Sequence, residues 1–221
     1  MPYRQQKNIA KRAIDAIHTL AIKHRWSAEA GCKYSEVAVG IDDIRPHSTR
    51  VLVGDLTYRP EFKRLPTFLR IITGDFTVND SPLTSLGGLA YVAGNVSIHG
   101  TNMTSLNNLF EVGGTLTIAP SLTDPTQSSK ITSLGHYLKK INSAHLEDSI
   151  VNDWGAVEEI TGDVHLSRRH TELISTLKGK TITGRILVEG KELLLTKDDN
   201  NKVIDLVPPP QNPGIAVLPD R

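Results

Sequence analysis

Four glycines at a regular spacing of twenty residues constrain the fold of this chain more than any other feature. Gly54, Gly74, Gly94 and Gly114 begin the phrases GDLTY, GDFTV, GNVSI and GTLTI. A fixed period of this length is typical of a repeat protein, in which similar coils stack on one another. Each coil packs only on its neighbours, so such an array usually works through its surface rather than through a catalytic pocket.

The apolar positions between the glycines repeat in the same register. The repeat at Gly74 has Phe76, Val78, Leu83, Leu86, Leu89 and Val92, and the repeat at Gly94 has Val96, Ile98, Met103, Leu106, Leu109 and Val112. Within each five-residue phrase, apolar and polar residues alternate, as in a β-strand with one buried face. We therefore expect a strand at each glycine, and parallel pairing of the strands from successive coils.

An insertion and a substitution interrupt the later repeats. Residues 120–130 break the unit after the fourth glycine and are expected to form a protruding loop. Asn142 stands where the next glycine is expected, Gly162 follows twenty residues later, and a degenerate copy starts at Gly184. The period thus predicts about seven coils, from about residue 51 to about residue 189.

Two of the repeats resemble a known family. The phrases GDFTVNDSPLTSLGGLAYV and GNVSIHGTNMTSLNNLFEV resemble leucine-rich repeats, in particular the short variant of receptor L domains and of many bacterial and phage proteins. The resemblance covers about 51–189. It implies a right-handed solenoid with a parallel sheet on one side, and a role in recognising proteins or other ligands. The usual Asn ladder is absent and Thr-Ser pairs occupy the corresponding bend, which suggests a shape nearer a three-sided β-helix.

The residues before the array, 1–50, are expected to cap it. Six apolar residues recur at helical spacing in an otherwise basic segment: Ile9, Ala13, Ile14, Ile17, Leu20 and Ala21. We expect an amphipathic helix that covers the amino-terminal end of the solenoid, followed by a first strand at Val37–Ile41. A partner helix, an anionic membrane surface and nucleic acid are the alternative targets of this segment.

The residues after the array divide into two parts. Residues 190–206 contain two apolar runs around the turn KDDNNK, which predicts a capping hairpin. Residues 207–221 are rich in proline and cannot form a helix or a central strand. This tail is either an extended arm docked on the body or on a neighbour, or a disordered end.

Length and composition fit one elongated domain. The chain has 221 residues and 38% hydrophobic residues, and its net charge of +1 gives no global attraction to nucleic acid. Cys32 is the only cysteine, so an internal disulfide is excluded. The sequence shows neither a signal peptide nor a membrane span, which predicts a cytoplasmic location in a bacterial cell or in an infected host cell.

The exposed strand positions are the candidate binding residues. The position one residue after each glycine holds Asp55, Asp75, Asn95, Thr115, Ser143, Asp163 and Arg185, and the position three residues after it holds Thr57, Thr77, Ser97, Thr117, His145, His165 and Leu187. The register places His145 and His165 side by side, about 5 Å apart. We predict binding through Asp75, Asn95, Ser97, His99, Thr117, His145, Asp163, His165, Arg168 and Arg169.

Three consecutive basic residues follow the last of these strands. Arg168, Arg169 and His170 are expected to form a basic spot, which either contacts an acidic partner or is simply a solvated turn. Columns of Thr and Ser also favour strand structure, so part of the exposed face has a structural explanation.

Catalytic signatures are missing from the sequence. With Asp163 and Glu147 nearby, the two histidines could hold a metal or act as acid and base, but no third ligand stands at a suitable spacing. There is no phosphate-binding glycine-rich loop, GxSxG, HExxH or CxxC motif. We therefore expect a protein that is not an enzyme and needs neither metal nor cofactor.

The expected function is binding of another protein through the strand face and the inserted loop. The preferred version is a bacterial or phage factor that binds and inhibits a host protein or defence complex. One alternative is a virion or assembly component, a homo-oligomer joined through the amino-terminal helix or the carboxyl-terminal tail. The other is a nucleic-acid binder that uses the basic helix.

Overall fold

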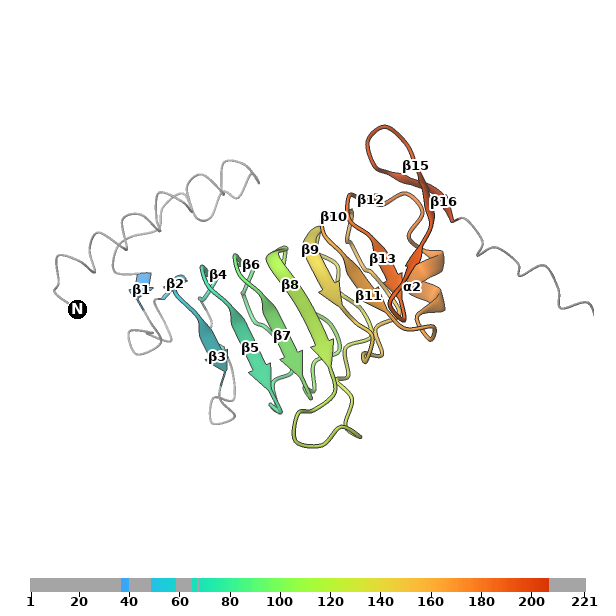
Figure 1. Cartoon of the computed structure of the whole chain (residues 1–221). Helices are drawn as coiled ribbons and strands as arrows, with labels where there is room; N and C mark the ends of the chain where they lie inside the picture. Colours follow the sequence, from blue (N-terminus) through green and yellow to red (C-terminus); the bar gives the residue numbers. More distant parts are fainter. Residues whose placement is uncertain (1–36, 40–48, 59–64, 67, 207–221) are drawn as a thin grey trace, which may run out of the picture.

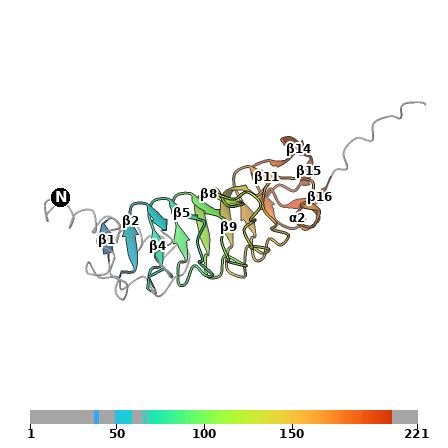
Figure 2. The same cartoon turned by 90° about the horizontal axis from the view of Figure 1, so that it is seen from below.

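The chain forms an elongated stack of coils. A computed structural model describes residues 37–39, 49–58, 65–66 and 68–206. These residues are mainly β and build a solenoid of about seven turns with roughly 20 residues in each coil (Figures 1 and 2). The predicted amino-terminal helix and the Pro-rich tail lie outside the described residues.

Each coil contributes strands to two rows, one on either side of the repeated glycine. The first row consists of β1 (Val37–Val39), β2 (Val51–Val53), β4 (Ile71–Ile72), β6 (Tyr91–Val92), the beginning of β8 (Glu111–Ala119), the beginning of β9 (Lys140–His145), β10 (Glu159–Ile160) and β12 (Thr181–Ile182). The second row consists of β3 (Leu56–Tyr58), β5 (Phe76–Asn79), β7 (Val96–His99), the ends of β8 and β9, β11 (Val164–Leu166) and β13 (Ile186–Val188). All pairs within a row are parallel.

The resemblance to leucine-rich repeats implied a parallel sheet on one side of the solenoid only, but the first row forms a second strand-bearing side. Strands β8 and β9 run through the corner between the rows, so the two rows join in a single 14-stranded sheet. The remaining side of each coil is a return segment, where the isolated parallel bridges Ser105↔Ser133 and Ser133↔Asp153 link successive coils. This arrangement agrees with the expectation of a shape nearer a three-sided β-helix.

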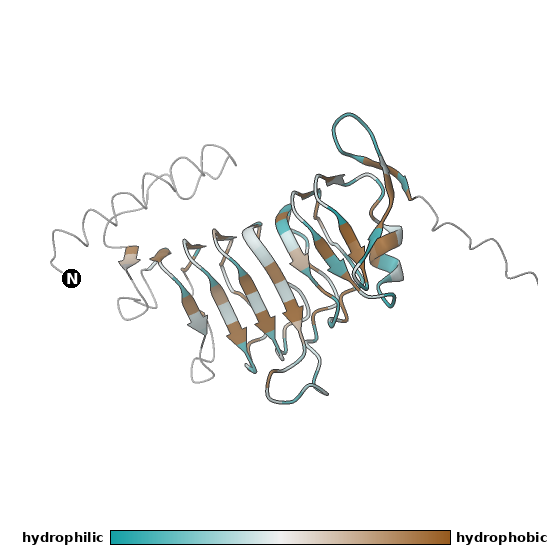
Figure 3. Ribbon diagram, viewed as in Figure 1, coloured by the Kyte–Doolittle hydropathy of each residue, from teal (hydrophilic) through white to brown (hydrophobic). Residues whose placement is uncertain are grey.

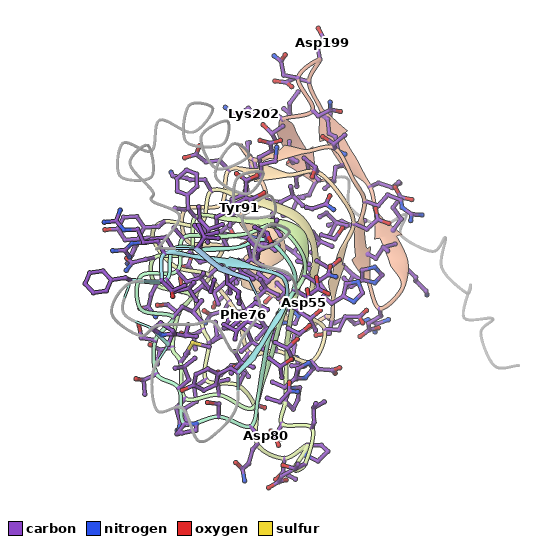
Figure 4. The ribbon with its side chains drawn as sticks, turned by 90° about the vertical axis from the view of Figure 1, so that its left-hand side faces the viewer. Asp55, Phe76, Asp80, Tyr91, Asp199 and Lys202 are labelled. Carbon is purple, nitrogen blue, oxygen red and sulfur yellow. The ribbon has the colours of Figure 1, made fainter. Side chains whose placement is uncertain are left out.

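The interior of the coils is one continuous apolar core. Strands of the second row alternate between buried and outward residues, as the sequence predicted. Phe76, Val96 and Leu116 are fully buried in neighbouring coils, and the same cluster extends to Val203 near the carboxyl end. Figure 4 looks along the array and places Phe76 inside the cross-section, with Asp55 at its edge. Figure 3 shows the hydrophobic and hydrophilic bands that result along the strands.

Close stacking explains the twenty-residue glycine period. A Cβ on Gly74 would lie 2.7 Å from the carbonyl oxygen of Gly54, and one on Gly94 would lie 2.7 Å from that of Gly74. Each glycine N–H in turn donates to the carbonyl oxygen of the glycine one coil earlier, at 3.1 Å for both pairs. Of the four glycines only Gly54 has a positive φ, of 114°. The period therefore reflects lack of space for a side chain more than a special backbone conformation.

The carboxyl-terminal coils end in antiparallel strands. β14 (Lys191–Leu193) folds back on β13, and β15 (Leu195–Lys197) pairs with β16 (Val203–Leu206) in a second hairpin. A short helix, α2 (Thr171–Ser175), replaces the return segment of the preceding coil. The buried indole of Trp154 donates from Nε1 to the carbonyl oxygen of Leu173 in this helix at 2.8 Å. Parallel stacking of the second row stops at β13, because β14 pairs with β13 in the antiparallel direction and occupies the next position in the sheet.

Candidate functional site

One column of outward residues runs along the whole second row. We call it the strand face, and it consists of Thr57, Thr77, Ser97, Thr117, His145, His165 and Leu187, each paired in register with the next. The register confirms the prediction that His145 and His165 are direct neighbours. Every member is partly or fully exposed. Because the neighbours on either side in the sequence point into the core, packing fixes the direction of these side chains.

The two histidines form the chemically distinct part of the strand face. Their ring centroids lie 4.4 Å apart and the ring planes are tilted by 55°. Partial burial lowers the pKa of His145 and the charge of His165 lowers it further, while Glu147 acts in the opposite direction. At neutral pH His145 is therefore an uncharged imidazole, which offers one hydrogen-bond donor and one acceptor.

The position next to the glycines connects each coil to the following one. Asp55, Asp75 and Asn95 each use the side-chain Oδ1 to accept the backbone N–H one coil later, at 2.8, 2.7 and 2.9 Å. Asp163 does the same for the N–H of Arg185, at 2.9 Å. The predicted binding residues Asp75, Asn95 and Asp163 thus each have one side-chain oxygen engaged in coil stacking, a structural role that their sequence positions do not indicate.

Asp163 and Arg185 also form an ion pair beside the histidines. The guanidinium Nε of Arg185 lies 3.2 Å from Oδ2 of Asp163. Hydrogen bonding from this side chain, followed by the bond from the backbone N–H of Arg185, lowers the pKa of Asp163 to about 2. The carboxylate is therefore ionised throughout the physiological range, and its charge is matched on the protein itself.

The predicted basic spot contains two charges rather than three. Arg168 and Arg169 are exposed, and they contact the neighbouring coils through an ion pair with Glu189 at 2.8 Å and a bond to the carbonyl oxygen of Glu147 at 2.6 Å. The prediction that His170 belongs to this exposed basic spot is wrong, because only 2% of His170 is exposed. Its Nε2 lies 3.1 Å from the carbonyl oxygen of Ser149 and its Nδ1 accepts the N–H of Ser167. Burial lowers the pKa of His170, so the ring is neutral.

The inserted loop, residues 120–130, extends from the carboxyl end of β8 (Figure 1). Its turn is ordered around Asp124, which accepts hydrogen bonds from the N–H of Thr126 at 3.1 Å and the side-chain amide of Gln127 at 2.9 Å. Thr123 donates to Oδ2 of Asp80 at 3.0 Å, which ties the loop to the coil of β5. Leu122 remains 61% exposed near this tether. The loop therefore holds an exposed apolar side chain a few residues after β8, which carries the strand-face residue Thr117.

His99 lies beside the strand face, two residues after Ser97 at the carboxyl end of β7. It pairs in register with Asn79 on one side and Ala119 on the other. Its side chain is half-buried, and among the described residues its Nδ1 has no hydrogen-bond partner. Ser97 and His99 thus lie on one strand, β7, Thr117 lies on the adjacent strand β8, and His145 and His165 lie further along the same array.

The described residues contain no group of three or more His, Cys, Asp or Glu side chains that could hold a metal ion. Nor does any helix in the described ranges have the length and apolarity needed to cross a membrane. Comparisons with known protein families, with curated proteins and with solved structures find no match for this chain. The surface described above is therefore the basis for a functional proposal.

Proposed function

We propose that this protein binds another protein through the strand face and the inserted loop, and that it is not an enzyme. The observation that carries the proposal is the continuous register of the strand face, from Thr57 through His165 to Leu187. Six of the seven positions, all but Leu187, hold hydroxyl or imidazole groups at a constant spacing of about 4.8 Å between neighbouring strands. Such a surface favours hydrogen bonding to a partner of extended, regular shape.

The side chains around the strand face support the same proposal. Leu122 in the inserted loop supplies an exposed apolar side chain, and the uncharged His145 supplies a hydrogen-bond donor and an acceptor on the strand face. Interfaces between proteins combine apolar contacts with a polar rim in this way. The resemblance to leucine-rich repeats adds a family in which solenoid surfaces recognise proteins. In the preferred version the partner is a host protein or defence complex, and the chain is a bacterial or phage factor that inhibits it.

The proposal is tested by affinity capture with two matched triple variants. The first, Thr117→Glu, His145→Glu and His165→Glu, places three carboxylates on the strand face. The control, Thr84→Glu, Thr104→Glu and Thr132→Glu, places three carboxylates at exposed positions of the return segments. We expect a protein retained from host lysate by the unchanged chain and by the control variant, and lost from the strand-face variant.

Equal retention by both triple variants would contradict binding through the strand face. Capture is repeated at low and high salt, because binding to nucleic acid weakens steeply as salt rises. A partner retained at high salt and after nuclease treatment is a protein. Loss of all capture under those two conditions would favour the nucleic-acid alternative, and a chain that only captures copies of itself would favour the assembly alternative.

A further inference from the structure

Two imidazole rings lie in contact on neighbouring strands of the second row. His145 on β9 and His165 on β11 are paired in register, and their ring centroids are 4.4 Å apart. The two strands run parallel and side by side (Figure 1). Because Ala144 and Val164, one residue earlier on each strand, are fully buried in the core, the backbone holds both histidines on the outward side of the sheet. Stacking of the coils therefore brings the two imidazoles together.

The ring nitrogens of this pair are available to a ligand. Among the residues that the structure describes, no group is hydrogen-bonded to either ring, whereas both nitrogens of the buried His170 are engaged, with Ser149 and Ser167. His145 is exposed and His165 is partly exposed. Partial burial lowers the pKa of His145, so at neutral pH its ring is an uncharged imidazole with a lone pair on one nitrogen.

The spacing of the two rings suits a metal ion bound by both of them. Zn–N bonds of about 2.0–2.1 Å at tetrahedral angles hold two ligand nitrogens about 3.4 Å apart. Ring centroids 4.4 Å apart, with a tilt of 55° between the ring planes, allow nitrogens on the facing edges to reach that separation through small side-chain rotations. Imidazole nitrogen is a good ligand for Zn²⁺, Cu²⁺ and Ni²⁺, whereas Mg²⁺ and Ca²⁺ prefer oxygen ligands. The geometry therefore favours a first-row transition metal.

We propose that His145 and His165 together bind one divalent transition metal ion, such as Zn²⁺, through one nitrogen of each ring. Water molecules complete the coordination, because the strand face is open to solvent at this position. Structural zinc sites have four protein ligands and catalytic zinc sites have three. A site with two protein ligands on an exposed surface therefore exchanges its metal readily, and it is a binding site rather than a catalytic centre.

The charges around the pair permit a cation there. Glu147 opposes the lowering of the pKa of His145, so it contributes negative charge beside the site. The guanidinium of Arg185 is compensated by Asp163, with Nε 3.2 Å from Oδ2. Arg169 binds the carbonyl oxygen of Glu147 and keeps its own charge, which moderates the affinity for a cation. We therefore expect a site weaker than a zinc centre with four protein ligands.

The proposal is tested by calorimetric titration of the full chain with Zn²⁺ at pH 7.5, in a buffer that does not bind metal. Two ligands on one rigid surface bind more tightly than either alone because the second contact is intramolecular, so His145→Gln and His165→Gln should each weaken binding by about tenfold or more. The double variant should lose little more than either single variant. The control, His136→Gln, removes an exposed histidine outside the strand face and should leave the affinity unchanged.

NMR of the imidazole resonances locates the bound ion. One equivalent of Zn²⁺ should shift the resonances of His145 and His165 together and should leave those of His99 and His170 in place. Protons compete with the metal for the ring nitrogens, so the affinity should fall as the pH is lowered from 7.5 to 5.5. Mg²⁺ at the same concentration should shift neither resonance, because it prefers oxygen ligands.

Equal Zn²⁺ affinity of the unchanged chain and of His165→Gln would overturn the proposal. An additive, stepwise loss across the two single variants and the double variant would also overturn it, because the histidines would then act independently. Binding that leaves both imidazole resonances in place would assign the ion to other residues and would have the same consequence. Circular dichroism of each variant verifies folding. The proposal does not rest on the proposed function, since none of these measurements uses a partner.

Discussion

Oδ1 of Asp75 accepts a hydrogen bond from the backbone N–H of Asn95 at 2.7 Å, across the junction between two coils. Asn95 repeats the arrangement with Thr115, and Asp55 precedes it with Asp75. Each side chain thereby satisfies a backbone N–H at the corner between the two rows, where the strand ladder is interrupted. The Asp and Asn that follow the glycines act as connectors between successive coils.

Replacement of this connector is expected to lower stability. Asp75→Ala removes the acceptor for the N–H of Asn95 and should lower the free energy of unfolding by about 1 kcal/mol. Asp75→Asn keeps an oxygen at the same position and should cost less. Urea unfolding followed by circular dichroism measures the free energy of unfolding of both variants. An equal decrease in the two would show that the lost hydrogen bond does not cause the loss of stability.

The glycines are expected to resist substitution for two different reasons. Gly94→Ala would place a Cβ 2.7 Å from the carbonyl oxygen of Gly74, so the coils must separate, at a cost of about 2 kcal/mol or more. Gly87 has open space around it but a φ of 60°, so Gly87→Ala should cost about 1 kcal/mol.

Substitution by asparagine separates these two causes. Gly87→Asn should recover part of the loss because asparagine tolerates a positive φ, whereas Gly94→Asn should be at least as unstable as Gly94→Ala. Thermal melts of the four variants give the order, and a smaller loss for Gly94→Ala than for Gly87→Ala would contradict the stacking explanation.

Titration of His145 should depend on its neighbour. Partial burial and then the charge of His165 lower the pKa of His145, so His165→Gln is expected to raise that pKa toward 6.5. The imidazole resonances of His145, followed by NMR between pH 4 and 8, measure the change. Thr117→Ser, on the other neighbouring coil, leaves the charge of His165 in place and should not move the resonance. An unchanged pKa in His165→Gln would show that burial alone is responsible.

Stability should fall in mild acid because of His170. Burial lowers the pKa of His170 in the folded chain, so as pH falls below about 6.5 the unfolded chain binds a proton that the folded chain does not bind. Stability is therefore full above pH 6.5 and decreases as the pH falls toward the lowered value. His170→Gln should be less stable at pH 7.5 but should lose less between pH 7.5 and pH 5.

A neighbouring core substitution provides the control for this prediction. Leu173→Val also weakens the packing near α2 but removes no titrating group, so its loss in urea midpoint should be the same at both pH values. If His170→Gln and Leu173→Val show identical pH dependence, His170 does not account for the acid sensitivity.

The sequence alone predicted the coils, their number and the register of the strand face. It could do so because a period of twenty residues places chemically equivalent residues in line, and an alternating pattern says which of them point outward. The pairing of His145 with His165 follows from their separation of twenty residues, which is one repeat. His170 and α2 did not follow, because the coil that starts at Gly162 departs from the pattern after β11 and only packing turns that histidine inward.

The role of the residues beside the glycines also needed the structure. In the sequence Asp75 and Asn95 read as exposed polar groups available to a partner, and they are exposed, yet each has an oxygen bound to the next coil. A side chain that bonds to a backbone group twenty residues away leaves no separate mark in the sequence beyond its polarity.

By itself, the sequence determined that this chain is a solenoid and which residues line its outer columns, because local alternation and a fixed period are properties of the linear chain. The tertiary structure decided the rest. Pairs such as Ile71 and Ile72 look like one apolar run, but Ile72 enters the core while Ile71 joins a separate apolar cluster with Val51 and Tyr91. Burial on that second side depends on contacts with distant chain, which no local pattern encodes.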